Sequence, residues 1–170
     1  MIAKDDATDG INDRLYWGKN LHQQDVPNLE TITDGTVAKS DYNGKANTAA
    51  IIAGYAALSK DMDSRDMCRV LETYNEGGYT DWYIPAFGQL YELYSNKTAI
   101  NKALTAINGT KLSTSYGYWS SSELATSSAW IMRFDYGYVS YGDKDSNYYV
   151  RFVRDILALK PLKEKVLELE

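Results

Sequence analysis

The stretch that decides the fold lies between residues 130 and 140 and reads WIMRFDYGYVS. Large apolar residues occupy every second position from Trp130 to Phe134, and Ile131, Arg133 and Asp135 alternate with them. A period of two is typical of a β-strand, because successive side chains point to opposite faces. We therefore predict a strand with one face toward the core and with Ile131, Arg133 and Asp135 on the other face.

A hairpin is expected directly after this strand. Asp135-Tyr136-Gly137 has the composition of a tight turn, since glycine adopts the backbone conformations that such turns need. The alternation then resumes at Tyr138-Val139-Ser140, and a last strand is predicted from Tyr149 to Val153.

The segments before residue 117 carry a different period. Apolar residues recur at helical spacing from Asn47 to about Tyr74, as one long helix or a broken helix pair that ends at Gly77-Gly78. An extended piece closed by proline follows at Asp81–Pro85, and helical spacing continues from Leu90 to a stop at Asn108-Gly109. Helices in the middle and strands at the end predict an α+β domain.

The two ends of the chain are less regular. Residues 1–45 are polar and turn-rich and predict loops and short strands, including the apolar piece Thr36-Val37-Ala38. We expect them to belong to the same domain as residues 46–156, because 170 residues suit one domain of ordinary size. Residues 157–170 form a tail rich in Leu, Lys and Glu, to which no function is assigned.

Charge and hydropathy exclude several partners. The chain has 18 basic and 23 acidic side chains, and its basic residues are scattered, so no nucleic-acid partner is expected. The longest apolar run, Thr48–Leu58, is interrupted by Gly54 and is far shorter than the roughly 20 residues of a membrane helix, so no membrane insertion is expected. The first residues, Met1–Asp5, lack the apolar stretch of a signal peptide.

The residue inventory also argues against metal and catalytic sites. One histidine and one cysteine are too few for a zinc site, and Cys68 at a helical apolar position is expected in the core. The segment Asp61–Glu72 has acids at three positions of a calcium-binding loop, but Arg65 replaces a ligand and Asp66 replaces the glycine of its sharp turn. We predict no metal, no cofactor and no catalytic residue.

Tyrosine is strongly over-represented. The chain has 15 tyrosines and only three phenylalanines. A core built for burial favours phenylalanine, because a buried phenol must find a hydrogen-bond partner. Seven of the tyrosines fall within 34 residues, which indicates a surface: Tyr116, Tyr118, Tyr136, Tyr138, Tyr141, Tyr148 and Tyr149.

Several segments together resemble a bacterial and phage family with the C-type-lectin-like fold. They are Gly77–Pro85, Gln89–Leu93, Tyr118–Glu123, Ala129-Trp130, Phe134, Gly137, Lys144 and Val150–Arg154. Within that family they are most similar to the variable proteins of diversity-generating retroelements. The resemblance runs from about residue 47 to residue 156 and implies two or so helices packed on short, irregular antiparallel strands.

The resemblance implies that the residues between these framework positions, in a variable region of about 118–154, are recoded by adenine-directed mutagenesis. Such recoding of asparagine-type codons cannot produce Lys, Glu, Gln, Met or Trp. The nineteen slots are Leu124, Ala125, Thr126, Ser127, Ser128, Ile131, Arg133, Asp135, Tyr136, Tyr138, Ser140, Tyr141, Gly142, Asp143, Asp145, Ser146, Asn147, Tyr148 and Phe152. None holds an excluded type, whereas random slots would avoid all five types with a chance of about 2%.

The function that follows is non-catalytic ligand binding. Tyr, Ser, Gly, Asn and Asp suit a diversified surface, because tyrosine gives a large amphipathic contact with few rotors to freeze. The expected target is a protein or glycan on a cell surface, and the domain itself is expected to be displayed on a phage tail tip or a bacterial surface. Whether the protein forms a homo-oligomer is left open. The predicted ligand-binding residues are Ile131, Arg133, Asp135, Tyr136, Tyr138, Ser140, Tyr141, Asp143, Asp145, Asn147 and Tyr148.

Two alternatives remain open at this point. One is a structural module of a phage tail or cell surface, which only supports other chains. The other is an enzyme, because the formylglycine-generating enzymes share this broad fold by resemblance and depend on cysteine chemistry or a bound metal. The sequence does not identify the ligand or the oligomeric state.

Overall fold

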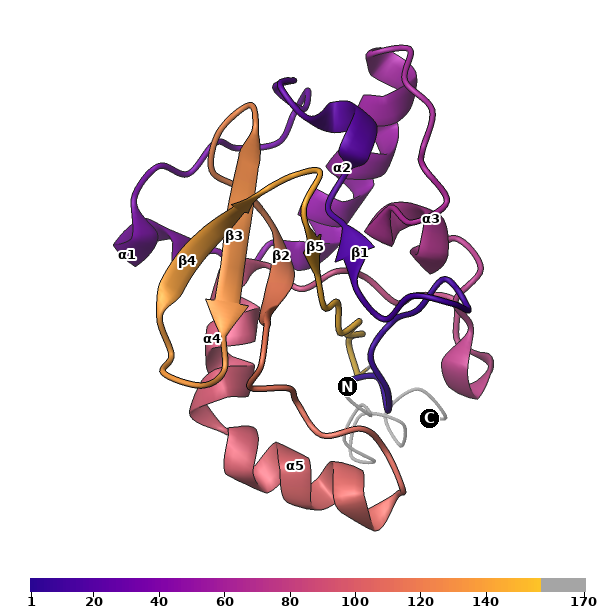
Figure 1. The fold of residues 1–170 in the computed structure, drawn as a ribbon, viewed down its shortest axis with the longest axis vertical. Helices are drawn as coiled ribbons and strands as arrows, with labels where there is room; N and C mark the ends of the chain where they lie inside the picture. Colours follow the sequence, from indigo (N-terminus) through magenta and orange to yellow (C-terminus); the bar gives the residue numbers. More distant parts are fainter. Residues whose placement is uncertain (157–170) are drawn as a thin grey trace, which may run out of the picture.

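The structure, a computed structural model, describes residues 1–156 and contains two small antiparallel sheets. Three strands, β2 (Gly117–Glu123), β3 (Ser128–Arg133) and β4 (Val139–Asp143), pair in the order β2-β3-β4. The second sheet pairs β1 (Leu15–Tyr16) with β5 (Asn147–Tyr148), so it joins the two ends of the domain (Figure 1).

The predicted hairpin is present, and β3 is the central strand of its sheet. Ile131 pairs with Trp119 of β2 and with Ser140 of β4. The chain turns between β3 and β4 at residues 134–138, where Gly137 has a φ of 69°. A side chain at this position would be strained and would also meet the ring of Tyr94. The turn is therefore fixed by glycine and by the helix beneath it.

The segment with helical spacing from residue 47 to residue 74 is a broken helix pair. Helix α2 (Gly44–Ala57) is capped by Leu58, and the next residue, Ser59, has a φ of 53°. Helix α3 (Met67–Leu71) follows only after an irregular segment. The carboxylate of Asp66 holds that segment, because it accepts hydrogen bonds from the Tyr55 hydroxyl (2.7 Å) and from the amides of Lys19 and Asp63.

The region from residue 87 to residue 106 also forms two helices. Helix α4 (Phe87–Ser95) begins after Pro85, where the Gln89 side chain accepts a hydrogen bond from the Ala86 amide. Helix α5 (Lys97–Ala106) follows after Asn96 and ends close to the predicted stop, where the Gly109 amide donates to Leu104 O. Two 3₁₀ turns, η1 (Lys19–Leu21) and η2 (Glu76–Gly78), complete the connections.

The apolar piece at residues 36–38 is helical, and the expectation of a short strand there is wrong. It forms α1 (Gly35–Ala38), one turn that begins at Asp34. The Asp34 carboxylate accepts hydrogen bonds from the amides of Thr36 and Val37. This cap satisfies amides that a helix leaves free at its start, and the local geometry prevails over the strand propensity of threonine and valine.

The three-stranded sheet separates two hydrophobic clusters. The first lies among β1, β2, α2 and α3 and includes Leu15, Trp17, Ile51, Trp119 and Ile131. The second lies between the sheet and α4 and α5, and its members include Phe87, Leu90, Trp130, Met132 and Phe134. The sheet is thus buried on both faces over most of β2 and β3. Residues 1–45 supply Leu15 and Trp17, so they are part of this packing.

The predicted last strand is an extended segment that makes single bridges instead of a ladder. Tyr149 bridges to Tyr118, and Val153 bridges to both Ile2 and Tyr83. Arg151 is fully buried behind this segment and pairs with Asp6 at 2.7 Å. The bridge between Ile2 and Val153 holds the two ends of the described chain side by side. Figure 1 shows the N-terminus next to the yellow end of the ribbon. The α+β class, with helices packed on short antiparallel strands, is confirmed.

Within residues 1–156, the structure contains no helix with the length and apolar character required to span a membrane.

Candidate functional site

Two exposed tyrosines lie in the turn of the β3–β4 hairpin. The side chains of Tyr136 and Tyr138 are 70% and 64% exposed, and their ring centroids lie 5.7 Å apart. Gly137 between them lies against the ring of Tyr94 from α4. Lys97, at the start of α5, donates a hydrogen bond to Phe134 O at 2.9 Å. The turn thus exposes two phenol rings, and contacts with Tyr94 and Lys97 hold its backbone in place.

An ion pair lies at the base of the same hairpin. Arg133 and Asp135 contact each other through two hydrogen bonds, the shorter of 2.6 Å. Hydrogen bonding from Arg133 lowers the pKa of the Asp135 carboxyl below its ordinary value, and the Tyr136 amide adds to this effect. Arg133 pairs in register with Gly117, and the ring of Tyr148 lies against Gly117, so Arg133 and Tyr148 are neighbours.

The residues of β4 divide between the two faces of the sheet. Tyr141 pairs in register with Trp130 and packs edge-on against its ring, with centroids 6.5 Å apart, yet it is 61% exposed. Ser140 is half-buried and pairs with Ile131, on the opposite face. Since side chains of a strand alternate, the exposed tyrosine of β4 is separated from Ser140. Asp143, at the end of β4, is exposed.

The β4–β5 loop is anchored by Lys144, whose side chain is fully buried. Its ammonium lies 2.5 Å from Glu123 of β2, donates to Gln24 O and lies over the Trp17 ring at 4.9 Å. Burial raises the pKa of Glu123 and lowers that of Lys144, and their hydrogen bond opposes both shifts. Asp145 is exposed in the turn that begins at Lys144.

Beyond the loop, Asn147 and Tyr148 are half-buried. The Asn147 side-chain oxygen accepts a hydrogen bond from Arg65 at 2.6 Å. The ring of Tyr148 packs edge-on against Trp119, with centroids 4.8 Å apart, and covers Gly117 and Gly142. Glycine at these two positions leaves room for the ring, because a Cβ on Gly142 would lie 2.5 Å from it.

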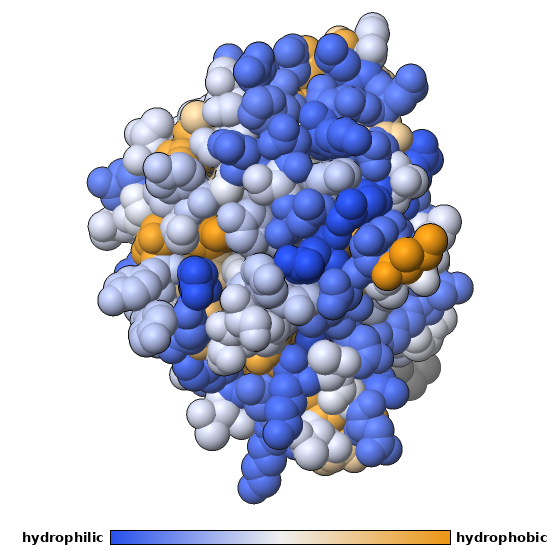
Figure 2. All heavy atoms as spheres, viewed as in Figure 1, coloured by the Kyte–Doolittle hydropathy of each residue, from blue (hydrophilic) through white to orange (hydrophobic). Residues whose placement is uncertain are grey.

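The structure brings together a contiguous part of the predicted set, which we call the tyrosine surface: Arg133, Tyr136, Tyr138 and Tyr148. Tyr141 and Asp143 lie on the other face of the sheet edge, and Asp145 lies at the tip of the β4–β5 loop. Figure 2 shows that the side with β3, β4, β5 and β1 in front is covered mainly by hydrophilic and intermediate residues, with hydrophobic ones only in small groups.

Ile131 does not lie on the ligand surface, contrary to the prediction from alternation. Its side chain is 2% exposed and packs in the first hydrophobic cluster. The alternation correctly separates Ile131 from Trp130, but both faces of the central strand are covered, one by α4 and the other by Trp119 and its neighbours. Phe152, another predicted variable slot, is fully buried for the same reason.

Several residues near this surface lie outside the predicted segment. The guanidinium of Arg14 is 4.3 Å from the centre of the Tyr116 ring, and that of Arg65 is 4.7 Å from the Tyr16 ring. Arg65 also binds Asn147, which places an N-terminal aromatic and a central arginine beside β5. The pairing of β1 with β5 and the bridge between Tyr16 and Asp66 bring these segments together, so no local sequence signal marks them.

Cys68 and the acidic segment Asp61–Glu72, the candidates in the sequence for catalysis or metal binding, have structural roles. Cys68 is fully buried, and burial raises the pKa of its thiol. The acidic segment Asp61–Glu72 places Asp66 inward, where its carboxylate serves as an acceptor for Tyr55 and two amides. Within the described chain, no group of three or more His, Cys, Asp or Glu side chains is arranged to hold a metal ion.

Comparisons with known proteins identify the family. The model of the Lcl C-terminal domain matches residues 7–154, which is most of the chain. The chain belongs to the Lcl C-terminal domain family. No curated protein matches it.

A solved structure shares the fold of this Lcl C-terminal domain. It is a fimbrial protein from Bacteroides ovatus ATCC 8483, with a TM-score of 0.62 and 17% sequence identity. The match covers 82% of this chain and 33% of the fimbrial protein, so the domain spans about a third of that protein's length. At this identity the likeness concerns the fold alone.

Proposed function

We propose that this Lcl C-terminal domain is a non-catalytic binding module that recognises a cell-surface protein or glycan through the tyrosine surface. The observation that carries the proposal is the exposure of Tyr136 and Tyr138 on a hairpin whose other side, at Phe134, is buried. Phenol rings exposed to water contribute little to folding, whereas at an interface they provide large contacts with few rotors to freeze.

The finer part of the proposal is that a retroelement diversifies this surface while the framework stays constant. The framework residues Glu123 and Lys144 form the buried ion pair, and Trp119 and Trp130 fill the two clusters. The slots between them include the most exposed tyrosines of the domain. Family membership and the fimbrial fold are consistent with a surface or adhesin-like module, displayed on a bacterial surface or a phage tail tip.

Sequencing many copies of the locus from its source population, together with the neighbouring DNA, tests diversification. We expect substitutions to concentrate at exposed slots such as Tyr136, Tyr138 and Tyr141, next to an asparagine-rich template copy. The buried slots Ile131 and Phe152 should retain apolar residues, because an unpaired polar group in the core is costly. Substitutions spread evenly over helices and strands would contradict this part of the proposal.

Binding is tested with labelled protein and whole bacterial cells in flow cytometry. The double change Tyr136→Ala and Tyr138→Ala should abolish cell binding, while Tyr141→Ala should have a smaller effect, because Tyr141 lies on the other face. Tyr42→Ala is the matched control, since Tyr42 is 49% exposed and lies outside the variable region. Binding by the double variant at the wild-type level, with the control unchanged, would exclude the tyrosine surface as the site.

A further inference from the structure

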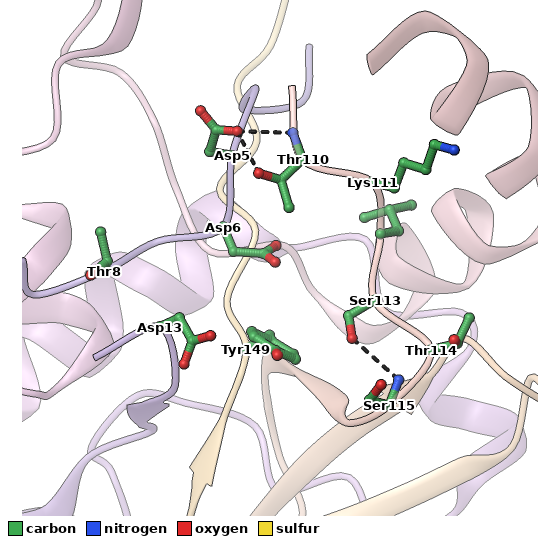
Figure 3. Close-up of a pocket in the computed structure, with 11 residues that line it drawn as sticks. Asp5, Asp6, Thr8, Asp13, Thr110, Lys111, Ser113, Thr114, Ser115 and Tyr149 are labelled. Atoms are coloured by element: carbon green, nitrogen blue, oxygen red, sulfur yellow. Dashed lines mark hydrogen bonds between the residues drawn. The ribbon is translucent and has the colours of Figure 1, made fainter. Parts of the chain in front are cut away.

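A second candidate site lies apart from the tyrosine surface. It is an open depression of about 810 Å³ between the N-terminal segment, the loop after α5 and the start of the last extended segment (Figure 3). Its volume falls in the range of small-molecule sites, which is roughly 300–1,000 Å³. The residues that line it are Asp5, Asp6, Thr8, Asp13, Thr110, Lys111, Leu112, Ser113, Thr114, Ser115 and Tyr149.

The walls of this depression combine apolar surface with side-chain oxygen atoms from several segments. The Asp5 carboxylate uses Oδ1 to accept hydrogen bonds from the amide and the hydroxyl of Thr110, at 2.9 and 2.6 Å. Ser113 Oγ accepts one from the Ser115 amide at 3.2 Å. Within the described residues these bonds leave Asp5 Oδ2 as an acceptor and the Ser113 hydroxyl as a donor. The walls therefore offer both partners of a hydrogen bond.

The same walls are rigid where the depression meets the core. Asp6 Oδ1 accepts a 2.7 Å hydrogen bond from the buried Arg151, and Asp6 Oδ2 accepts one from the Tyr118 hydroxyl. The Tyr118 hydroxyl in turn accepts from the Ser113 amide at 2.8 Å, and Asn101 accepts from the Leu112 amide at 2.9 Å. A loop fixed at several points loses little freedom when a ligand binds.

The distribution of charge selects the ligand class. Three carboxylates disfavour an anion, and Figure 3 shows the Lys111 ammonium directed away from the open space. Within residues 1–156 these carboxylates do not converge as metal ligands do. They are separated by hydroxyls, which suits a ligand with several hydroxyl groups that each donate and accept. We propose that this depression binds a neutral sugar residue.

The site is independent of the variable surface. Tyr149 is the one lining residue from the variable region. It is not one of the nineteen slots, and its ring packs against Tyr118 with centroids 5.4 Å apart. The sugar specificity of this depression would therefore stay constant while the tyrosine surface changes. A constant weak contact beside a variable one raises the effective concentration of the domain at a glycan-coated surface.

The test is an amide NMR titration of the ¹⁵N-labelled protein with the methyl glycosides of glucose, galactose, mannose and N-acetylglucosamine, to tens of millimolar. We expect one or more glycosides to shift amides confined to residues 5–13 and 110–115. The double change Asp13→Ala and Ser115→Ala should weaken this binding about thirtyfold, because it removes two hydrogen-bonding groups of roughly 1 kcal/mol each. Both side chains are exposed, so the fold should persist.

The control variant carries Tyr136→Ala and Tyr138→Ala and should bind the glycosides as the wild type does. This control distinguishes the two sites, because loss of cell binding and loss of glycoside binding can then occur independently. Calcium chloride and methylammonium chloride are titrated in parallel. Shifts with these cations but not with any glycoside, no shift with any glycoside, or glycoside binding that survives the Asp13 and Ser115 changes would each overturn the proposal.

Discussion

The buried ion pair between Glu123 and Lys144 sets a prediction of defined size. Both side chains are fully buried, and their charged atoms lie 2.5 Å apart. Lys144→Met would keep most of the length of the side chain but remove its charge, and would leave the Glu123 carboxylate buried without its cation. Breaking a buried pair in this way costs about 3–5 kcal/mol, whereas replacing both partners with apolar residues of similar volume is often neutral or stabilising.

We therefore expect Lys144→Met to lower the free energy of unfolding by about 3–5 kcal/mol. The double variant, Glu123→Leu with Lys144→Met, should recover most of that loss. Glu123 Oε2 has no hydrogen-bond partner among the described residues, so the carboxylate is already incompletely compensated and its removal relieves a further cost. The wild type and the double variant should then have similar free energies of unfolding, and that of the single lysine variant should be well below both.

Urea unfolding followed by tryptophan fluorescence measures these differences, because the chain has four tryptophans and Trp17 lies beside Lys144. Lys102→Met is the matched control, because it makes the same change at an exposed position of α5. Lysine and methionine have similar helix propensities, so this change should hardly affect stability. The reasoning is refuted if Lys144→Met costs less than about 1 kcal/mol, or if the double variant is destabilised by the sum of its single changes.

Three further predictions concern the hairpin and the core. Gly137→Ala should lower the free energy of unfolding by about 1–3 kcal/mol in thermal melts, because φ is 69° and the new Cβ would lie 2.3 Å from the Tyr94 ring; an unchanged melting temperature would contradict this geometry. Asp135 should titrate below the ordinary pKa of aspartate in carbon-detected NMR, and Arg133→Gln should raise that pKa. Because the folded-state pKa is depressed, this contact stabilises the fold above the unfolded pKa and is lost as the pH falls through the folded one. Cys68 should resist alkylation until the protein unfolds, and fast labelling of the native protein would show that its burial is wrong.

Much of the fold was predictable, because its signals are local. The β3–β4 hairpin follows from the alternation around Trp130 and from Gly137, and the helix stop follows from Asn108-Gly109. The division of residues 47–74 into α2 and α3 was left open, since the break depends on Asp66 and its acceptor bonds to distant groups. The turn at residues 35–38 was missed because the Asp34 cap outweighs the strand propensity of its neighbours.

The candidate site was predictable only in part. Tyrosine excess and the turn at Gly137 mark Tyr136 and Tyr138, which the structure exposes on one hairpin. The same alternation placed Ile131 on the surface, although the central strand is covered on both faces. The depression had no sequence signal, because residues 5–13 and 110–115 become neighbours only through tertiary contacts such as those of Asp5 with Thr110 and of Arg151 with Asp6.

The sequence by itself determined the α+β class, the strand and helix periods, the hairpin turn and the aromatic character of the exposed surface. These properties depend on residues a few positions apart, whose geometry the backbone fixes locally. Only the tertiary structure decided which alternating face is solvent-exposed, which carboxylates are buried with a cation, and which loops form a depression. These depend on contacts such as Asp6 with Arg151 and Glu123 with Lys144, and chain distance alone does not specify them.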